Sequence, residues 1–145
     1  MKQIETDICI IGGGSGGLSL AAGAVQMGAR VVLFEGGQMG GDCLNSGCVP
    51  SKALLAAAKA AYLANGNAAM GITNNPPNID FAAVKAHVAD VIAQIEPHDS
   101  IARFEALGVT VIPEMAHFTG PRAMASATHH VRAKYIVIAL SLIHI

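Results

Sequence analysis

The sequence contains no tryptophan, and aromatic residues make up only 4% of its 145 positions. Stacking surfaces for bases or sugars are therefore scarce. Charged residues are also few, at 13%, and the formal net charge is −1. This balance gives no electrostatic reason to expect a nucleic acid or an anionic membrane as partner. The hydrophobic content of 52% instead indicates one folded domain with a sizeable core.

The sequence also lacks a long uninterrupted apolar run. Its most apolar stretch, residues 8–34, is rich in glycine and is broken by Gln26 and Arg30. Glu5 and Asp7 precede this stretch, where a secretory signal peptide would carry basic residues. The 18 or more apolar residues of a membrane-spanning helix are missing. We therefore expect a cytoplasmic protein, in which paired cysteines are catalytic or metal-binding more often than structural.

The order of segment types along the chain predicts a single α/β domain. Residues 6–14 form a short β-rich run, and residues 15–29 place small and apolar side chains at helical spacing. Residues 30–37 form a second strand. Strand, glycine turn, helix and strand together make one βαβ unit.

A helical hairpin is predicted to follow this unit. Residues 51–66 are rich in Ala and Leu, and Asp80 is a candidate N-cap for a second long helix. Pro97 is expected to kink that helix or to begin a new helical piece over residues 98–109. The expected apolar face of the second helix consists of Phe81, Val84, Val88, Val91, Ile92 and Ile95.

Strand patterns return in the last third of the chain. Three strands are predicted, over residues 109–120, 123–127 and 129–140. Turns at Gly120-Pro121 and at Thr128 separate them. We expect these strands to complete a parallel sheet and to add a small antiparallel β-meander.

Gly12, Gly14 and Gly17 form a G-x-G-x-x-G motif in the context that such a motif requires. It follows a predicted strand and opens a predicted helix, and Glu35 ends the next strand. Gly12 permits the tight turn, Gly14 lets a pyrophosphate approach the backbone, and Gly17 lets the helix pack closely on the strands. The helix N-terminus offers N–H groups to the phosphates, and Glu35 can accept hydrogen bonds from a ribose. The motif predicts a dinucleotide site and leaves the choice between FAD and NAD open.

Two of the three cysteines, Cys43 and Cys48, lie close together in the segment GGDCLNSGCVPSK. The third, Cys9, lies in an apolar strand and is expected to be a small buried hydrophobe. A structural zinc site would need two or more further Cys or His ligands, and the six histidines are scattered. Three hypotheses remain for the pair: a redox dithiol, two thiolates that bind a soft metal ion directly, or a non-catalytic nucleotide- or thiol-binding module.

Geometry favours a redox dithiol over a passive structural disulfide. Two residues five apart on an ideal helix have Cα atoms about 8–9 Å apart. A disulfide needs a Cα separation of about 4.4–6.8 Å, so the first helical turn must be distorted. Gly47 and Pro50 would permit that distortion. A bond at a helix start is accessible to exchange, and the helix end favours a thiolate.

The segments IGGGSGG, FEGG and GGDCLNSGCVPSK resemble those of the class I pyridine nucleotide-disulfide oxidoreductases. That family includes dihydrolipoamide dehydrogenase, glutathione reductase and mercuric reductase, and the resemblance extends to YIVIA at residues 135–139. It implies a Rossmann-like FAD-binding domain over residues 1–139, with FAD as the bound nucleotide. It further implies electron transfer between NAD(P)H, flavin and a Cys43–Cys48 disulfide, and from there to a dithiol, disulfide or mercuric-ion substrate.

The resemblance also implies roles for individual residues. Cys43 would attack the substrate and Cys48 would face the flavin. Lys52 would lie near the flavin ring, where its charge stabilises reduced flavin. Glu35 would bind the adenosine ribose, and the backbone of Ala116 would meet the adenine side of FAD. The other cofactor-binding residues implied are Gly12, Gly14, Ser15, Gly16, Gly17, Gly41 and Asp42.

The chain departs from the family pattern in two places. Asp42 stands where a threonine is common in the family. The resulting GGDC segment most resembles that of the mercuric-reductase-like and lipoamide-dehydrogenase-like members. After IVIA the family continues with Thr-Gly-Ser, whereas residues 140–145 read LSLIHI, which we interpret as an atypical tail that removes backbone contacts near the FAD phosphates.

Family members also carry an NAD(P)-binding domain and a dimerisation domain with a His-Glu pair that protonates the substrate-attacking thiol. We expect neither domain in these 145 residues, and we expect homodimerisation only of a full-length protein. The 145 residues alone are therefore expected to show no NAD(P)H-dependent turnover.

Overall fold

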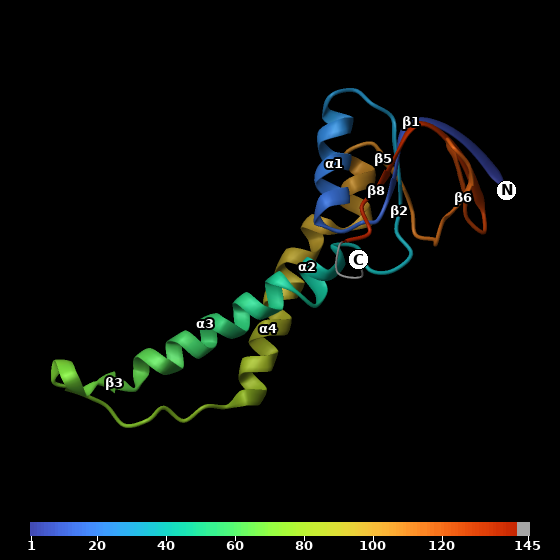
Figure 1. Cartoon of the computed structure of the whole chain (residues 1–145). Helices are drawn as coiled ribbons and strands as arrows, with labels where there is room; N and C mark the ends of the chain where they lie inside the picture. Colours follow the sequence, from blue (N-terminus) through green and yellow to red (C-terminus); the bar gives the residue numbers. More distant parts are fainter. Residues whose placement is uncertain (142–145) are drawn as a thin grey trace.

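The computed structural model describes residues 1–141 and shows a sheet from which a long helical arm projects (Figure 1). The sheet has six strands in the order β5-β2-β1-β8-β7-β6. The last residues of the predicted tail, 142–145, lie outside the described residues. The strands of the sheet are β1 (Lys2–Ile11), β2 (Val31–Phe34), β5 (Val109–Ile112), β6 (His117–Gly120), β7 (Ala123–Ala125) and β8 (His129–Ile138).

Four of these strands, β5, β2, β1 and β8, run parallel to one another. Helix α1 (Ser15–Gln26) connects β1 to β2, so the predicted βαβ unit is confirmed. All four side chains of β2 are buried, as expected for a strand that is covered on both faces. The parallel arrangement brings the carboxyl ends of β1, β2 and β8 to one edge of the sheet, where open α/β sheets bind ligands.

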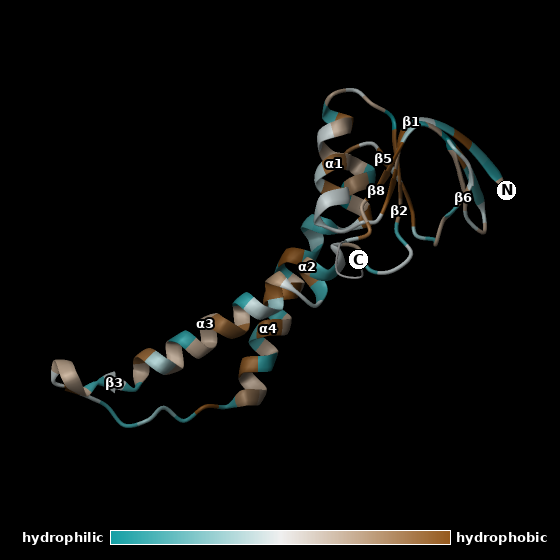
Figure 2. Cartoon of the chain, in the orientation of Figure 1, coloured by the Kyte–Doolittle hydropathy of each residue, from teal (hydrophilic) through white to brown (hydrophobic). Residues whose placement is uncertain are grey.

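The core lies on both faces of the sheet. On one face, Ile10 of β1 packs with Leu18 of α1 and with Phe104. On the other face, Cys9 and Val131 belong to a second buried cluster. The central strands are accordingly the most hydrophobic part of the chain (Figure 2).

The predicted β-meander is confirmed in β8, β7 and β6, which pair antiparallel. The prediction of one strand over residues 109–120 is wrong, because β5 and β6 lie at opposite edges of the sheet. Pro113 follows β5 and cannot donate a backbone hydrogen bond to a ladder. The N–H of Glu114 then bonds to the carbonyl of Ile112 at 2.8 Å, which turns the chain out of the strand direction.

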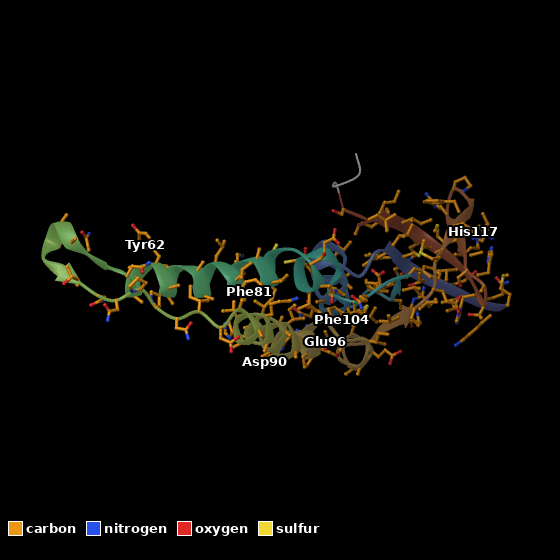
Figure 3. The ribbon with its side chains drawn as sticks, turned by 90° about the horizontal axis from the view of Figure 1, so that it is seen from below. Tyr62, Phe81, Asp90, Glu96, Phe104 and His117 are labelled. Carbon is orange, nitrogen blue, oxygen red and sulfur yellow. The ribbon has the colours of Figure 1, made fainter. Side chains whose placement is uncertain are left out.

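The predicted helical hairpin forms the projecting arm. It consists of α3 (Cys48–Ala64) and α4 (Phe81–Ile95), joined at the far end by a short 3-10 turn and a two-stranded β-ribbon. Asp80 caps α4 as predicted, because its carboxylate accepts the N–H of Ala83 at 3.1 Å. Phe81 is 60% exposed, whereas the rest of the predicted apolar face is half-buried. Figure 3 shows Phe81 and Tyr62 out along the arm, while Phe104 lies at its sheet end. The elements at the far end are β3 (Gly66–Asn67), the 3-10 turn Ala68–Met70 and β4 (Ile72–Thr73).

Pro97 changes the path of the chain between the arm and the sheet. It lies in a 3-10 turn, Glu96–Asp99, and a new helix, α5 (Ile101–Ala106), follows. Ser100 caps α5, because its hydroxyl accepts the N–H of Arg103 at 3.3 Å. Of the two alternatives predicted for Pro97, the new helical piece is the one that occurs, because α4 ends at Ile95 and α5 begins at Ile101. Among residues 1–141, no helix is both long enough and apolar enough to cross a membrane.

Candidate active site

The glycine turn after β1 requires glycine for a specific physical reason. Gly12 has φ +108°, a conformation that side-chain-bearing residues rarely adopt. A Cβ atom there would also overlap the carbonyl oxygen of Ala139, which follows β8. The N–H of Gly12 donates to the carbonyl of Phe34 at 2.8 Å. The tight turn predicted at Gly12 is confirmed, and it lies where β1, β2 and β8 meet.

Gly17 allows α1 to cross β1 at close range. A Cβ atom on Gly17 would overlap the carbonyl oxygen of Gly12. Ala21, one turn later, is completely buried on the same helix. The close helix–strand packing predicted for Gly17 is therefore confirmed.

The start of α1 and the carboxylate of Glu35 form the floor of a ligand-sized hollow. The N-cap of α1 is Gly14, which brings no side-chain acceptor to the N–H groups of the first turn. Glu35 is held by two backbone donors, because its oxygens accept the N–H groups of Gly13 and Gly37, each at 2.6 Å. Each carboxylate oxygen keeps lone-pair capacity for a further donor.

The cysteine segment is joined directly to this turn. It begins with α2 (Gly41–Asn45), and the N–H of Gly40 donates to the carbonyl of Gly13 at 2.8 Å. Gly41 has φ +56°, and a Cβ atom there would lie 2.8 Å from the Cα of Gly14. The close contacts of Gly40 with Gly13 and of Gly41 with Gly14 thus let the start of α2 lie against the start of α1.

The helical path between the two cysteines is broken, as the sequence predicts. Cys43 lies in α2 and Cys48 begins α3, three residues earlier than the predicted helix start. Gly47 lies at the break, with φ −112° and ψ −107°. A Cβ atom there would lie 2.8 Å from the carbonyl oxygen of Asp42.

Both thiols of the pair are free in this structure. The side chain of Cys48 hydrogen-bonds to Cys43 and raises the pKa of the Cys43 thiol, while the positive charge of Lys52 acts to lower it. The thiolate expected at the helix start is therefore not favoured at Cys43 in the dithiol state, because the shared hydrogen bond retains its proton. Burial raises the pKa of Cys9 to about 12, as expected of an unreactive core thiol.

The glycine turn and the dithiol line one cavity of about 670 Å³. Three residues that the sequence assigns to the site, Gly17, Lys52 and Ala116, do not line it. Gly17 is buried, Lys52 is exposed on α3, and Ala116 packs beside the core cluster on the far side of the sheet. The predicted residues that line the cavity are Gly12, Gly14, Ser15, Gly16, Glu35, Gly41, Asp42, Cys43 and Cys48.

Sequence reasoning missed the residues that close the cavity from the side of β8. Ile138 ends this strand, and Ala139 is fixed by a 2.8 Å hydrogen bond from its N–H to the carbonyl of Ile11. The sequence did contain the information needed to find these residues. A strand over residues 129–140 was predicted, and in a parallel sheet its carboxyl end lies at the same edge as that of β1. The missed lining residues are Gly47, Ile138, Ala139, Leu140 and Ser141.

Cys43 also lines a second cavity, of about 350 Å³, which Cys48 does not line. This second cavity lies among α1, the cysteine segment and α4–α5, and its charged lining residues are Asp99 and Arg103. Cys43 is half-buried and Cys48 is exposed. Among residues 1–141, no group of three or more His, Cys, Asp or Glu is gathered to hold a metal ion.

The glycine turn, the acid at the end of β2 and the dithiol all fall within one family match. The sequence model described as "Pyridine nucleotide-disulphide oxidoreductase" matches residues 6–140. The chain belongs to this family. Its members are flavoprotein disulfide reductases that use a pyridine nucleotide, so the predicted enzyme class is confirmed at that level.

Pyridine nucleotide-disulphide oxidoreductases of two named kinds are similar to the chain over most of its length. Mercuric reductase of Bacillus cereus is 31% identical over 135 residues, which cover 93% of this chain and 21% of that protein. Dihydrolipoyl dehydrogenase 2 of Arabidopsis thaliana is 33% identical over 141 residues, 95% of this chain and 25% of that protein. The chain thus spans about a fifth to a quarter of the length of these curated relatives.

A solved structure of the family supports the fold. The Cu(II) complex of the HOCl-induced flavoprotein disulfide reductase RclA from Escherichia coli matches with a TM-score of 0.73 at 23% identity. The match covers 91% of this chain and 27% of that one. The predicted Rossmann-like α/β fold is confirmed.

Proposed function

We propose that this chain is the FAD-binding and redox-dithiol part of an FAD-dependent disulfide reductase. In this function electrons pass between NAD(P)H, flavin and the Cys43–Cys48 pair, and from there to a dithiol, disulfide or mercuric-ion substrate. The observation that carries the proposal is the single cavity lined by both the glycine turn and the two cysteines. When bound, FAD would supply the hydride and electron transfer that protein side chains cannot perform.

The residues of the cavity fit a flavin dinucleotide. Gly14, Ser15 and Gly16 would hold the pyrophosphate through backbone N–H groups at the start of α1. Glu35, fixed by two backbone donors, would accept the ribose hydroxyls. Cys48 lies on the same cavity wall, so a bound flavin would cover this exposed thiol. The positive charge of Lys52 acts on the dithiol from outside the lining.

Cys43 is proposed as the thiol that meets the substrate, because it alone lines the second cavity as well. Its thiolate would attack a substrate disulfide, form a mixed disulfide and release one substrate thiolate. Cys48 would then attack the Cys43 sulfur, which releases the second substrate thiol and leaves a Cys43–Cys48 disulfide. Two electrons pass from the dithiol to the substrate in this exchange.

The cellular setting is proposed from the family. We place the protein in the cytoplasm, with a small-molecule or metal-ion substrate, and we expect NAD(P) binding and homodimerisation to need the further length that the relatives have.

A trapping experiment tests the roles of the two cysteines. The reduced Cys48→Ser chain is mixed with glutathione disulfide, an acyclic disulfide, and analysed by mass spectrometry after digestion. We expect a mixed disulfide on Cys43, because the released glutathione leaves, the Cys48 thiol is absent and the remaining thiol, Cys9, is buried. The matched Cys43→Ser chain should trap far less adduct, and adduct formation on Cys48 as fast as on Cys43 would contradict the assignment.

A flavin titration tests the cavity separately. FAD fluorescence is followed as the 145-residue chain is added, with FMN as the matched ligand that lacks the adenosine half. Saturable quenching with FAD and weaker quenching with FMN is the expected result. Equal behaviour of the two flavins would contradict the roles of Glu35 and the glycine turn.

A further inference from the structure

Two arginines mark a second site at the end of the sheet opposite the dithiol. Arg132 lies near the start of β8, six residues before Ile138, which lines the dinucleotide cavity. At about 3.3 Å per strand residue the two places are about 20 Å apart. Arg132 and Arg122 together line two hollows there, of about 400 and 220 Å³.

The backbone positions of the two arginines are fixed by the sheet. Arg132 lies opposite Ala123 in the β7–β8 ladder. The carbonyl of Arg122, just before β7, accepts the N–H of Ala133 at 3.0 Å. The side chains of Arg122, just before β7, and of Arg132 in β8 therefore start from neighbouring backbone positions.

Two other cations that line the smaller hollow, Lys134 and Arg30, are both paired with Asp7. Asp7 accepts from Lys134 at 2.8 Å and from Arg30 at 3.3 Å, and these bonds hold the pKa of Asp7 well below its usual range. Within residues 1–141, neither Arg122 nor Arg132 forms an ion pair. Glu5 lines the smaller hollow in register with Arg132 and yet makes no ion pair with it.

We propose that Arg122 and Arg132 bind the phosphate group of a small phosphate monoester. Guanidinium groups donate in a planar fork that matches phosphate oxygens, and a phosphate offers enough acceptors and charge for two of them. The larger hollow supplies a floor for the organic part of the ligand, through Gly120, Pro121 and Ala123. His130, which bonds to Thr119 at 3.3 Å, lines the same hollow and can donate from a ring nitrogen.

Calorimetric titration with phenyl phosphate and with inorganic phosphate tests the site. Both titrations are run on the 145-residue chain at constant ionic strength. We expect saturable binding of both, and tighter binding of phenyl phosphate because its ring contacts the apolar floor. In the Arg122→Gln/Arg132→Gln double variant both affinities should fall by about tenfold or more, since two charge-assisted contacts are lost. Lys85→Gln, which removes an exposed cation on α4, is the control that should bind as the unaltered chain does.

A charge-conserving variant separates a built site from general attraction. Arg122→Lys/Arg132→Lys keeps the charge but removes the planar forks, so we expect weaker binding than in the unaltered chain. Equal affinity in this variant would overturn the proposal, as would unchanged binding in the glutamine double variant, which would place the phosphate at the glycine turn. Equal affinity for the two probes would overturn the role of the apolar floor. Far-ultraviolet circular dichroism shows that each variant is folded.

Discussion

The backbone N–H of Gly40 donates a 2.8 Å hydrogen bond to the carbonyl oxygen of Gly13. This bond joins the glycine turn after β1 to the cysteine segment, although 27 positions separate the two residues in the chain. Gly14 and Gly40 also form an isolated parallel bridge. The spacing between the glycine turn and the dithiol is thus set by backbone contacts between glycines, and a Cβ atom on the neighbouring Gly41 would lie only 2.8 Å from the Cα of Gly14.

Gly17→Ala should destabilise the fold strongly, while Gly23→Ala on the same helix should not. The new Cβ at Gly17 would overlap the carbonyl oxygen of Gly12, whereas at Gly23 nothing lies within 4 Å. We expect a loss of about 3 kcal/mol in unfolding free energy for Gly17→Ala. A gain of about 0.5–1 kcal/mol is expected for Gly23→Ala. Urea unfolding followed by circular dichroism measures both, and equal effects would contradict the packing described.

Lys52→Met should raise the pKa of the Cys43 thiol. The ammonium group of Lys52 lowers this pKa by stabilising the thiolate, so its removal shifts the titration upward. Iodoacetamide alkylation of Cys43, measured by mass spectrometry from pH 6 to 10, should therefore slow at neutral pH. Lys59→Met on the same helix is the matched control and should leave the profile in place.

Cys48→Ala should shift the same profile in the opposite direction. The hydrogen bond with the Cys48 side chain is the largest cause of the raised Cys43 pKa, and alanine removes it. We expect faster alkylation of Cys43 at pH 7 than in the unaltered chain. Slower alkylation would show that the shared hydrogen bond does not hold the proton on Cys43.

Glu35→Gln should weaken FAD binding by about tenfold. The reason is that the two hydrogen bonds that the ribose hydroxyls would donate to the charged carboxylate become weaker or are lost. The amide group of glutamine would also point a donor at one of the two backbone N–H groups that the carboxylate now accepts. Flavin fluorescence quenching measures the affinity. Glu105→Gln, an exposed residue of α5, is the control, and an unchanged affinity in Glu35→Gln would exclude this carboxylate from the site.

Asp7→Asn should lower the thermal midpoint at pH 7, and the difference should shrink as the pH falls below about 4. The pKa of Asp7 is lowered by its bonds to Lys134 and Arg30, so the folded state prefers the ionised form. That stabilisation is complete above the unfolded pKa of about 3.9 and declines progressively below it, until the much lower pKa of the folded state is passed. Melting curves from pH 3 to 8 measure the effect. Asp90→Asn on the exposed side of α4 should follow the unaltered chain at every pH.

The sequence alone determined the local chemistry of the candidate site. Two local patterns, G-x-G-x-x-G between a strand and a helix and Glu35 at the end of the next strand, together predict a dinucleotide site. The break at Gly47 between the cysteines was likewise predictable, because an ideal helix cannot bring residues five apart together. Helix caps such as Asp80 were predictable as well, since the bonds they make span only three residues.

Tertiary structure decided which residues share a cavity. Only the pairing of β8 beside β1 brings Ala139 to the glycine turn, and only the placement of β5 and β6 at opposite edges splits the predicted strand at Pro113. The same is true of Arg122 and Arg132, which the pairing of β7 with β8 brings together and which form no ion pair within residues 1–141. Contacts between distant segments depend on sheet order and register, and these follow from packing of the whole chain, which no local pattern encodes.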